Sequence, residues 1–524
     1  MPPVTTSDNP EELARLMTAD PGLPRSNPTP AYWQHIPHPL ANARSERFHS
    51  RRNYAIIGSG VTGLSVAKTV LENHPTATVS VLEARSLCSG ATGRNGGQMA
   101  ANAGEEYMHL AEVFGSEMAG KIANFTLRNL NAMHALVEEF DAVETSEVQR
   151  LKKLRVFMTE AKFEDFRRSL ARLEADHPTL KGMYTLVDAN TLLEVNGSSL
   201  SLIVLWRPIS TPANIIPIVS FSRVEQTYSI HGACGGALLS AGTVWPYRLV
   251  TKVFDTLLKR YPGRFAIETH TPVLAVEVDH ISSSTSPAAC SYSVHTARGS
   301  ITVEHVIYCT NGYSGHLLPA LRGPIYPFKG TMTVQDAGTS IRNQGNSVAW
   351  GFHSPPSFDP VTKRHGYGLY YLGQSAKSGY LYFGGENKRI DDAVSADDSF
   401  VATSSVEHLQ SSLPRFFAKT EEVSPPWKLV SSWSGIMGFT SDGLPMVGQL
   451  PSSLTGRKGG GEWIAAGFNG YGMANCFLCR EALALMMLGK PRPDWLPEAY
   501  QISEERVAAH FVSKEATPAT GSKL

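Results

Sequence analysis

A glycine-rich turn near the start of the chain constrains the fold more than any other feature of the sequence. The apolar run Tyr54–Ile57 leads into Gly58-Ser-Gly60-Val-Thr-Gly63, and Leu64–Leu71 follows with a helical pattern. In a strand–turn–helix unit of this spacing, the first glycine permits the tight turn, the second lets the backbone approach a pyrophosphate, and the third lets helix and strand pack closely. The N–H groups at the start of the helix then face the phosphates. The pattern therefore predicts a dinucleotide site.

An acidic residue closes the next predicted strand. Thr78–Leu82 ends on Glu83, 20 residues after Gly63, where a carboxylate can accept hydrogen bonds from the ribose hydroxyls. A carboxylate at this place disfavours the 2′-phosphate of NADP, so FAD and NAD are the expected ligands. A glycine-rich turn without a ligand is the alternative, which the strand, the helix and the acidic residue around the turn make the less favoured interpretation.

A second glycine-rich segment favours FAD over NAD. Gly90-Ala-Thr-Gly-Arg-Asn-Gly-Gly-Gln98 follows the second strand closely, where a plain NAD domain would continue into another strand–helix unit. Glycines in this place suit a backbone that runs close along an extended ligand. We therefore expect FAD.

Five segments, in the same order along the chain, give the sequence a family resemblance. It resembles the FAD-dependent D-amino-acid oxidase (DAO) superfamily, which includes glycine and sarcosine oxidases, over about residues 53–195 and 232–495. It looks closest to the γ-glutamylputrescine oxidoreductase-like branch, in which GASGRNGGQ follows the second strand. The five segments are Gly90–Gln98, Thr269–Glu277, Val306–Ser314, Trp433–Gly448 and Trp463–Ala474.

The resemblance implies an α/β fold in which a Rossmann-type FAD-binding domain is joined to a discontinuous α+β substrate domain, the glutathione-reductase-like FAD fold. The implied parts are an N-terminal arm (1–50), the FAD-binding domain (51–105, 232–322 and 428–495), the substrate domain (106–231 and 323–427) and a C-terminal tail (496–524). Residues 197–230 fit no family pattern, and they represent either an insertion on the substrate face or an error in the gene product.

Spacing of apolar residues predicts the main helices outside the first strand–turn–helix unit. We expect helices over 105–141, broken near Gly115 and Gly120, over 161–177 and over 246–261. The resemblance implies a last helix, from about Met473 to Leu488, that would direct its positive end at the flavin of a bound FAD.

The resemblance also implies which residues hold FAD, when each family motif is carried onto the matching position. Val273 would contact the adenine, and the two glycine-rich segments would follow the pyrophosphate and the ribityl chain. The implied FAD-binding residues are Gly58, Gly60, Val61, Thr62, Gly63, Glu83, Ala84, Arg85, Ser89, Gly90, Arg94, Asn95, Gly96, Gly97, Gln98, Val273, Thr310, Asn311, Gly435, Asp442, Gly443, Asn469, Gly470, Tyr471, Gly472 and Met473.

The implied reaction is oxidation of a C–N bond. The flavin accepts a hydride, while the protein orients an amine or amino acid and keeps it in an apolar, partly desolvated site. The predicted catalytic residues are Tyr382, Trp433 and Tyr471, with ordinary core packing as the alternative for any single aromatic residue. Other candidate wall residues are Trp350, His353, Tyr370, Tyr371, Tyr380 and Phe439.

Two departures from the family pattern bear on the chemistry. The cysteine that binds flavin covalently in sarcosine and fructosyl-amino-acid oxidases is replaced by Gly435, so we expect non-covalent FAD. The lysine with which those enzymes activate O2 is replaced by Tyr382. Lys329 and Lys377 are the candidate lysines that could take over this role. We expect an oxidase that forms an imine and H2O2. A flavin dehydrogenase with another acceptor and a non-catalytic flavin-binding protein are the alternatives.

Composition excludes several classes of partner. Lys and Arg number 47, as do Asp and Glu, whereas a nucleic-acid-binding protein normally has a basic excess. No apolar run approaches the ~20 residues that span a bilayer. The six cysteines are too few for a disulfide scaffold and fit a reducing compartment. Cys476 and Cys479 form one C-x-x-C without a second pair, so no metal site is expected.

The sequence ends in Ser522-Lys523-Leu524. A C-terminal SKL is a peroxisomal address that an import receptor reads, and a polar tail that matches by chance is the alternative. We therefore expect a peroxisomal location, with the import receptor as a partner.

Overall fold

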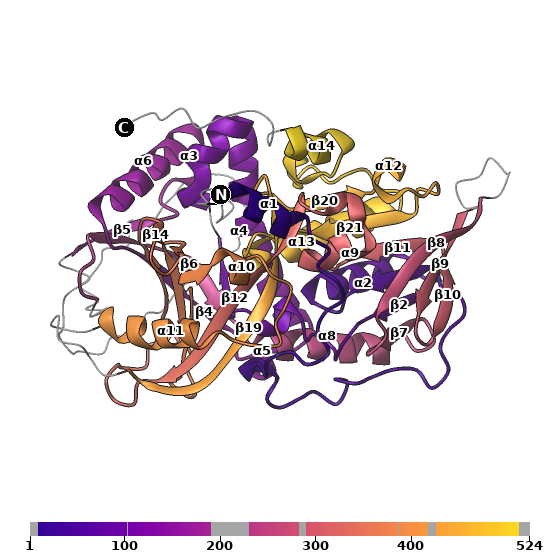
Figure 1. Ribbon diagram of the computed structural model, residues 1–524, viewed down its shortest axis with the longest axis horizontal. Helices are drawn as coiled ribbons and strands as arrows, with labels where there is room; N and C mark the ends of the chain where they lie inside the picture. The colour runs from indigo at the N-terminus through magenta and orange to yellow at the C-terminus, as the bar shows by residue number, and fades with distance from the viewer. Residues whose placement is uncertain are drawn as a thin grey trace.

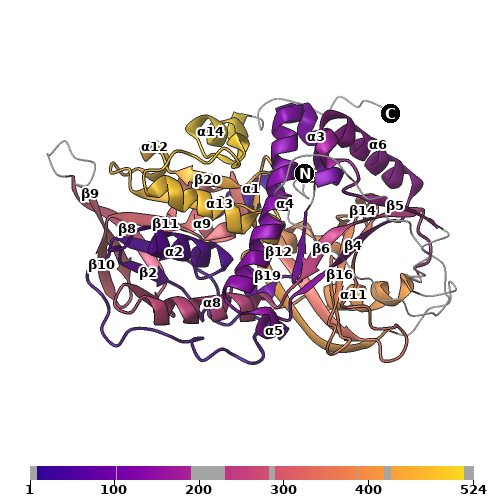
Figure 2. The ribbon, with the colours of Figure 1, turned by 180° about the vertical axis from the view of Figure 1, so that it is seen from behind.

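The computed structural model describes residues 9–101, 103–189, 230–281, 290–385, 387–417 and 426–512. Two large sheets lie in the two halves of the molecule, and helix α4 (Ser116–Glu139) runs between the halves (Figures 1 and 2). The first sheet belongs to the predicted dinucleotide domain and the second to the predicted substrate domain, so the α/β class expected from the sequence is confirmed.

The first sheet has six strands in the order β20-β21-β11-β1-β2-β7. All neighbours are parallel except β20, which pairs antiparallel with β21. The central strands are buried on both faces, as in parallel sheets covered on each side. The strands are β1 (Tyr54–Ile57), β2 (Val79–Leu82), β7 (Phe265–Glu268), β11 (His305–Tyr308), β20 (Met446–Gln449) and β21 (Glu462–Ala466).

Alternate residues of β1 enter two different cores. Tyr54 and Ile56 join the core that includes helices α2 (Val61–Asn73), α8 (Pro246–Arg260) and α13 (Gly472–Met487). Ala55 and Ile57 join a core with a three-stranded sheet on the other side, formed by β8 (Val273–Ile281), β9 (Cys290–Thr296) and β10 (Gly299–Val303). The strand therefore needs apolar residues at every position, which explains its continuous apolar sequence.

The second sheet is assembled from distant parts of the chain, as a discontinuous domain requires. It has nine strands in the order β19-β12-β17-β16-β13-β4-β6-β3, with β5 paired to β6. The strands are β3 (Gln98–Ala100), β4 (Gln149–Phe157), β5 (Thr185–Asp188), β6 (Gly235–Thr243), β12 (Ile325–Asp336), β13 (Val348–His353), β16 (Leu369–Gln374), β17 (Leu381–Gly384) and β19 (Lys428–Thr440).

The domain boundaries differ from the sequence-based ones at three strands. We assigned the ranges that hold β3, β6 and β19 to the FAD-binding domain, but these strands pair in the second sheet. Strand pairing joins all three to the other domain. The smaller strands there are β14 (Ser357–Asp359), β15 (Arg364–Gly366) and β18 (Asn387–Arg389).

Helices α3 (Ala103–Phe114), α4 and α6 (Glu160–Asp176) lie close to their predicted positions. The predicted break at Gly115 is present, since this glycine adopts a φ of 83° between α3 and α4. The second expected break, at Gly120, is wrong. Gly120 lies inside α4, where the His177 ring packs so closely that an added Cβ would lie 2.2 Å from it. Short helices complete the fold: α5 (Val143–Ser146), α9 (Ser314–Leu317), α10 (Ile390–Ala393), α11 (Thr403–Arg415) and α12 (Ser452–Thr455).

The two ends of the chain contain more structure than expected. The N-terminal arm forms α1 (Pro10–Thr18) and buries Trp33. Residues 496–512 of the predicted tail form α14 (Glu504–Val512) and bury Tyr500 against the FAD-binding domain. The sequence-based prediction describes these segments only as an arm and a tail and places no helix in either.

Two predicted features lie outside the described residues. They are the segment 197–230, apart from Ile230, and the tripeptide Ser522-Lys523-Leu524. Within the described residues, no helix is both long and apolar enough to cross a membrane. The same residues contain no cluster of three or more His, Cys, Asp or Glu side chains suited to a metal ion.

Candidate active site

A cavity of about 1010 Å³ extends between the two sheets. One end lies at the carboxyl ends of β1, β2 and β11, where ligands bind in open parallel sheets. The other end reaches the second sheet and the helices α3 and α6. Most of the predicted FAD-binding residues line this one cavity. They are Gly58, Gly60, Val61, Thr62, Glu83, Ala84, Arg85, Gly90, Arg94, Asn95, Gly96, Gln98, Val273, Thr310, Asn311, Gly435, Asn469, Gly470, Tyr471, Gly472 and Met473.

Glu83 is held rigidly at the dinucleotide end. Its Oε2 accepts hydrogen bonds from the backbone N–H of Ser59 at 3.1 Å and from the Ser59 hydroxyl at 2.6 Å. Its Oε1 accepts one from the backbone N–H of Arg85 at 2.9 Å. The carboxylate therefore has a fixed orientation at the cavity edge, as an acceptor for ribose hydroxyls requires.

The turn before α2 has the close packing that the glycine spacing of Gly58–Gly63 predicts. A Cβ at Gly63 would lie 2.0 Å from the carbonyl oxygen of Gly58, so only glycine lets the helix approach the strand. Gly63 thus acts through packing and does not line the cavity. Gly60 caps α2, and Val61 and Thr62 bring the start of the helix to the cavity wall. This arrangement suits a bound phosphate.

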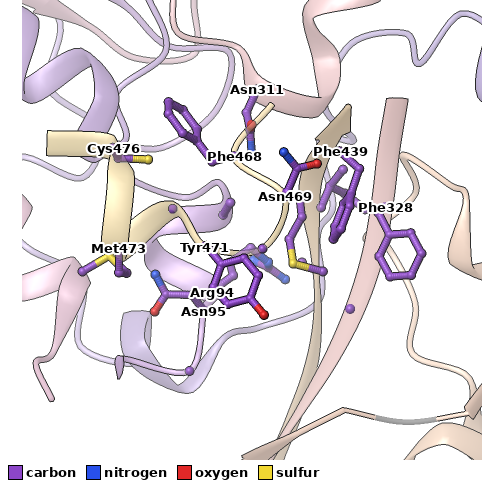
Figure 3. A pocket seen from close by; sticks show the side chains of 18 of the residues that line it. Arg94, Asn95, Asn311, Phe328, Phe439, Phe468, Asn469, Tyr471, Met473 and Cys476 are labelled. Atoms are coloured by element: carbon purple, nitrogen blue, oxygen red, sulfur yellow. The ribbon is translucent and has the colours of Figure 1, made fainter. Parts of the chain in front are cut away.

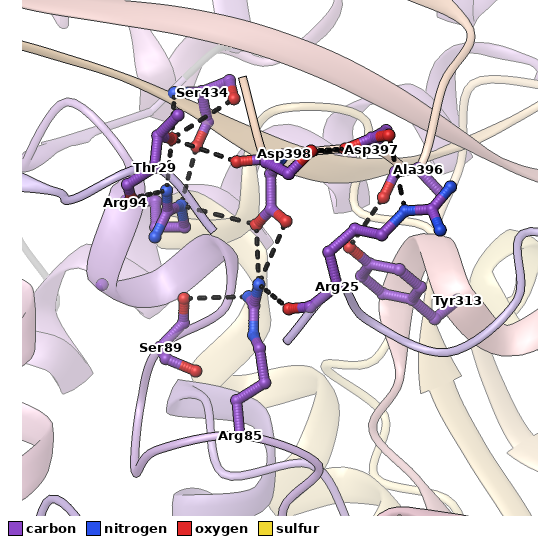
Figure 4. A network of polar contacts seen from close by, with 12 residues as sticks. Arg25, Thr29, Arg85, Ser89, Arg94, Tyr313, Ala396, Asp397, Asp398 and Ser434 are labelled. Carbon is purple, nitrogen blue, oxygen red and sulfur yellow. Dashed lines mark hydrogen bonds and ion pairs between the residues drawn. The ribbon is translucent and has the colours of Figure 1, made fainter. Parts of the chain in front are cut away.

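Two buried arginines, Arg85 before the glycine-rich segment and Arg94 within it, share one carboxylate (Figure 4). Arg85 donates to both oxygens of Asp398 at 3.0 and 2.9 Å, and Arg94 Nε lies 3.7 Å from Asp398. Arg94 also donates to the Ser434 carbonyl at 2.7 Å and to the Thr29 hydroxyl at 2.8 Å. Burial lowers the pKa of Arg94 to about 10, against the opposing effect of Asp398. The pair therefore fixes the segment against β19 and the N-terminal arm.

The loop before α13 forms the wall at the other side (Figure 3). Asn469 accepts a hydrogen bond from the Thr440 N–H at 2.8 Å and donates one to the Gly467 carbonyl at 2.8 Å. These bonds hold a φ of 53° at Asn469, which places Tyr471 in the cavity and starts α13 at Gly472. The start of α13 therefore faces the cavity, as predicted.

Two predicted catalytic residues, Tyr382 and Trp433, do not line the cavity, in contrast to what the aromatic pattern led us to expect. Both are buried on the face of the second sheet that carries Tyr371 and Gly435, but other segments cover them. Trp33 stacks on Tyr382, and Trp433 donates to the Arg94 carbonyl at 2.8 Å. Tyr471, the third predicted residue, does line the cavity.

Other predicted residues also lie away from the cavity. Asp442 forms an ion pair with Arg506 of α14 at 2.6 Å, and Ser89, Gly97 and Gly443 do not contact the cavity either. Among the candidate wall residues, His353, Tyr371 and Phe439 line it. Trp350, Tyr370 and Tyr380 do not, because Trp350 and Tyr370 belong to the core on the opposite face of the second sheet and Tyr380 packs beside Tyr32 of the arm.

Sequence reasoning missed a charged group on the cavity wall, formed by Glu105, Lys153 and Arg155 beside His353. Arg155 pairs with Glu105 and donates to the Ala101 carbonyl at 3.1 Å. His353 Nδ1 lies 2.9 Å from the other oxygen of Glu105. Burial would raise the pKa of Glu105, but His353 and Arg155 hold it well below its usual value. The alternation of Lys153, Arg155 and Phe157 along one strand was the available signal.

Lys329 and Lys377 are the candidates to replace the family lysine that activates O2, and neither is free in the cavity. The Lys329 ammonium pairs with Asp392 and lies 3.6 Å over the Phe400 ring. Lys377 is largely exposed and lies 3.8 Å from Glu147. Lys388 shares Asp392 at 3.5 Å. Replacement of the family lysine by Tyr382 is therefore not compensated by a cavity lysine at these positions.

A buried arginine near the dinucleotide end of the cavity bears on whether this end suits an anion. Arg480 of α13 is fully buried beside the thiols of Cys309 and Cys476, and both of these cysteines line the cavity. Its two terminal nitrogens have no hydrogen-bond partner within the described residues. A Cβ at Gly90 would meet nothing within 4 Å, which leaves the wall open there. A buried positive charge without a carboxylate partner among the described residues, next to two cysteines that line the dinucleotide end, fits a site for an anion such as a pyrophosphate.

Residues 53–486 match the family described as FAD dependent oxidoreductase (DAO). The chain belongs to this family. Its cofactor is therefore FAD, which the fingerprint turn, Glu83 and the starts of α2 and α13 would hold. Membership agrees with the resemblance drawn from the five sequence segments, while the nearer likeness to the γ-glutamylputrescine oxidoreductase-like branch stays a prediction.

Solved structures share the fold at low identity. Glycine oxidase from Geobacillus kaustophilus has a TM-score of 0.61 and 16% identity, over 87% of this chain and 99% of that chain. Iminodiacetate oxidase from Chelativorans sp. BNC1 has a TM-score of 0.57 and 15% identity, over 86% and 98%. L-proline dehydrogenase from P. horikoshii has a TM-score of 0.57 and 14% identity, over 87% and 97%. A search of curated protein sequences gave no match.

Proposed function

We propose that this FAD-dependent oxidoreductase oxidises the C–N bond of an amine or amino acid to an imine, with O2 as the electron acceptor. The observation that carries the proposal is one continuous cavity. It joins the glycine-rich turn before α2 to a chamber, the part of the cavity lined by the aromatic and charged side chains of Glu105, Lys153, Arg155, His353, Tyr371 and Phe439. When bound, FAD accepts the hydride from the carbon next to nitrogen, and its reoxidation passes two electrons and two protons to O2, giving H2O2.

The side chains around the chamber suit an uncharged amine. Tyr371, Met437 and Phe439 supply apolar wall and limit water, so that the ammonium form of a substrate is disfavoured there. Tyr471 stands at the start of α13, between the dinucleotide end and the chamber. These residues hold the substrate against the place where the loop before α13 would position the flavin.

We propose that FAD is bound without a covalent link. Gly435 lies in the cavity wall at the position where relatives carry the linking cysteine, and it has no side chain that could form a bond. Cys309 and Cys476 also line the cavity, but burial raises the pKa of both thiols, to about 12 and about 11. A protonated thiol is a poor nucleophile. Acid precipitation should therefore release all the flavin into the supernatant.

The names of similar structures support oxidation at a C–N bond, since they describe glycine oxidase, iminodiacetate oxidase and L-proline dehydrogenase. They include both oxidases and a dehydrogenase, so the acceptor needs a direct test. A yellow purified protein that amines or amino acids bleach under nitrogen would support the proposed reaction. Rapid recolouring in air with release of H2O2 would support the oxidase, and slow recolouring would favour a dehydrogenase. A protein that no amine or amino acid bleaches would contradict the proposal.

We also propose import into peroxisomes through Ser522-Lys523-Leu524. Catalase in that organelle would remove the H2O2 that the proposed reaction forms. A fluorescent protein fused in front of the last residues should become punctate with a peroxisomal marker. The same fusion with Leu524 deleted should stay diffuse, and unchanged puncta would contradict the proposal.

A further inference from the structure

Among the charged and titratable side chains that line the cavity, four group together on three elements, while Glu106 and His109 of α3 and Lys162 and Asp165 of α6 also line it. Lys153 and Arg155 alternate on β4, His353 ends the adjacent strand β13, and Glu105 lies in the first turn of α3. The neighbouring Lys152 points to the other face of the sheet, where its ammonium donates to Ser240 at 3.1 Å. Strand alternation thus commits Lys153 to the cavity and Lys152 to the outside.

A glycine makes room for two of these side chains to meet. Gly351 lies next to Arg155 in the register of β13 and β4. A Cβ added at Gly351 would lie 3.2 Å from Nε2 of His353 and 3.3 Å from Cε of Lys153. The imidazole and the lysine side chain therefore approach the same point on the cavity wall.

Nε2 of His353 and the ammonium of Lys153 can both form further hydrogen bonds at this point. The carboxylate of Glu105 accepts from Nδ1 of His353, which leaves the lone pair of Nε2 as an acceptor. His353 is 5% exposed, and its Nε2 has no partner among the described residues. The Lys153 ammonium, with three donors, has no hydrogen bond or ion pair within the same part of the chain. The wall thus offers donors and an acceptor side by side.

The charges favour one particular ligand. When Lys153 is protonated, Lys153 and Arg155 are positive and Glu105 is negative, so with a neutral imidazole these four side chains carry one unbalanced positive charge. A monoanion such as a carboxylate balances it, and a carbon-bound ammonium beside two cations is pressed to lose its proton. A compound that carries a carboxylate and an amine close together matches the donors and the acceptor at once.

We propose that Lys153 and His353 form a two-point site for an amino acid, in which Lys153 binds the carboxylate and Nε2 of His353 takes the proton from the amine. The proton moves from the substrate nitrogen to Nε2, and Glu105 stabilises the imidazolium that results. Arg155 positions Glu105 through their ion pair. The inference rests on the proposed function and narrows its substrate class to amines that carry a carboxylate.

Matched compounds test the carboxylate contact. Flavin bleaching under nitrogen is measured with proline against pyrrolidine and with glycine against methylamine. The amino acid of each pair should bleach the wild-type protein at a concentration at least tenfold lower than the amine. Lys153→Met should raise the half-saturating concentration of the amino acids about tenfold to a hundredfold, the range for loss of a hydrogen bond to a charged group.

One further variant controls for general damage to the fold, and a second tests the meeting point of Lys153 and His353. Lys152→Met removes a lysine from the same strand but from the opposite face, and should leave every half-saturating concentration unchanged. Gly351→Ala removes no charge but fills the point where Lys153 and His353 meet, so it should weaken amino-acid binding as Lys153→Met does. Equal FAD content in all variants shows that the cofactor site is intact.

The role of His353 is tested by pH. With saturating substrate, the bleaching rate of the wild-type protein should fall at low pH as His353 becomes protonated. Glu105 faces this imidazole and favours its charged form, while Lys153, Arg155 and burial oppose it. His353→Asn should lower the bleaching rate at least tenfold and abolish this acid limb. A limb that persists in His353→Asn would overturn the role of the histidine.

A binding measurement separates failure of this inference from failure of the proposed function. Isothermal titration calorimetry of the FAD-loaded protein with acetate and cyclopentanecarboxylate needs no turnover. Carboxylate binding that Lys153→Met weakens and Lys152→Met does not would support the site, even if no compound bleached the flavin. Bleaching by amines with equal carboxylate binding in the wild type and Lys153→Met would overturn the inference and leave the proposed function standing.

Discussion

Trp33 of the N-terminal arm stacks on Tyr382 of the substrate-domain sheet, with ring centroids 4.2 Å apart and ring planes 18° apart. The indole Nε1 donates to the Asn95 carbonyl at 2.5 Å, and the Trp33 carbonyl accepts from Trp245 at 2.7 Å. One arm residue therefore connects the glycine-rich segment, the second sheet and α8. The arm is part of the wall behind the cofactor site.

Replacement of Trp33 should loosen this wall. Trp33→Ala removes a large buried side chain, which costs about 3 to 5 kcal/mol of stability in typical cores. We expect a lower melting temperature and faster FAD release, since Asn95 lines the cavity and loses its fixed partner. Thermal unfolding and flavin fluorescence during dilution measure the two effects. Ile36→Ala, at an exposed site in the same arm, should change neither, and unaltered FAD release in Trp33→Ala would contradict the role of the arm.

Glu83 should affect FAD affinity more than folding. Glu83→Gln keeps the shape of the side chain but replaces one carboxylate oxygen with an NH2 group, which cannot accept from Ser59 or from a ribose hydroxyl. We expect FAD affinity to fall roughly tenfold or more, since hydrogen bonds to charged groups contribute about 1.5 to 3 kcal/mol. Titration of the apoprotein with FAD, followed by flavin fluorescence, measures the change. Glu277→Gln, at an exposed site, is the matched control.

The cofactor half of the site was largely predictable from sequence because its determinants are local. Gly58 and Gly60 act through backbone geometry within one strand–turn–helix unit, and the Glu83 carboxylate follows the next strand, so a short stretch of sequence identifies all three. The start of α13 follows from the same logic. The family motifs also placed Gly435 and Asn469 in the cavity wall.

The substrate half was poorly predictable because it depends on contacts between distant segments. Tyr382 has the right strand and face, yet Trp33 of the N-terminal arm, far away in the sequence, covers it. Lys153 and His353 face each other only because β4 and β13 pair in parallel, and nothing near either residue in the sequence reveals this pairing. Aromatic composition indicated a wall but could not show which rings pack in the core.

Arg480 should influence cofactor affinity and stability in opposite directions. Its guanidinium is buried without an acidic partner among the described residues, and burial lowers its pKa to about 10. Replacing such a charge with an apolar side chain of similar length is often neutral or stabilising. Arg480→Met should therefore leave the melting temperature of the apoprotein unchanged or higher. It should weaken FAD binding about tenfold, because a positive charge behind the cavity residues Cys309 and Cys476 is lost.

Asp442 should behave as a stability residue, although the family motif suggested a contact with the cofactor. It accepts hydrogen bonds from Nε and Nη2 of Arg506 at 2.6 and 3.0 Å, and its own Oδ1 holds the Leu444 N–H at 3.0 Å. Asp442→Asn removes the charge from this partly buried pair, and we expect a loss of about 1 to 3 kcal/mol. Chemical denaturation measures this loss. FAD affinity should stay within about twofold of wild type, and a larger drop would return Asp442 to the cofactor site.

Carboxylate binding should weaken as pH rises through neutrality. Burial and the neighbouring charge of Arg155 lower the pKa of Lys153 to about 7, while Glu105 opposes the shift. Only the protonated ammonium attracts an anion, so affinity is full below this pKa and declines above it. A bound carboxylate favours the protonated form and shifts the midpoint upward in the complex. Calorimetric titration with acetate between pH 5.5 and 9 should give a Kd that rises about tenfold per pH unit at the alkaline end, up to the pKa of the complex. Lys153→Met should remove this dependence, whereas an unchanged slope in that variant would assign the titration to another group.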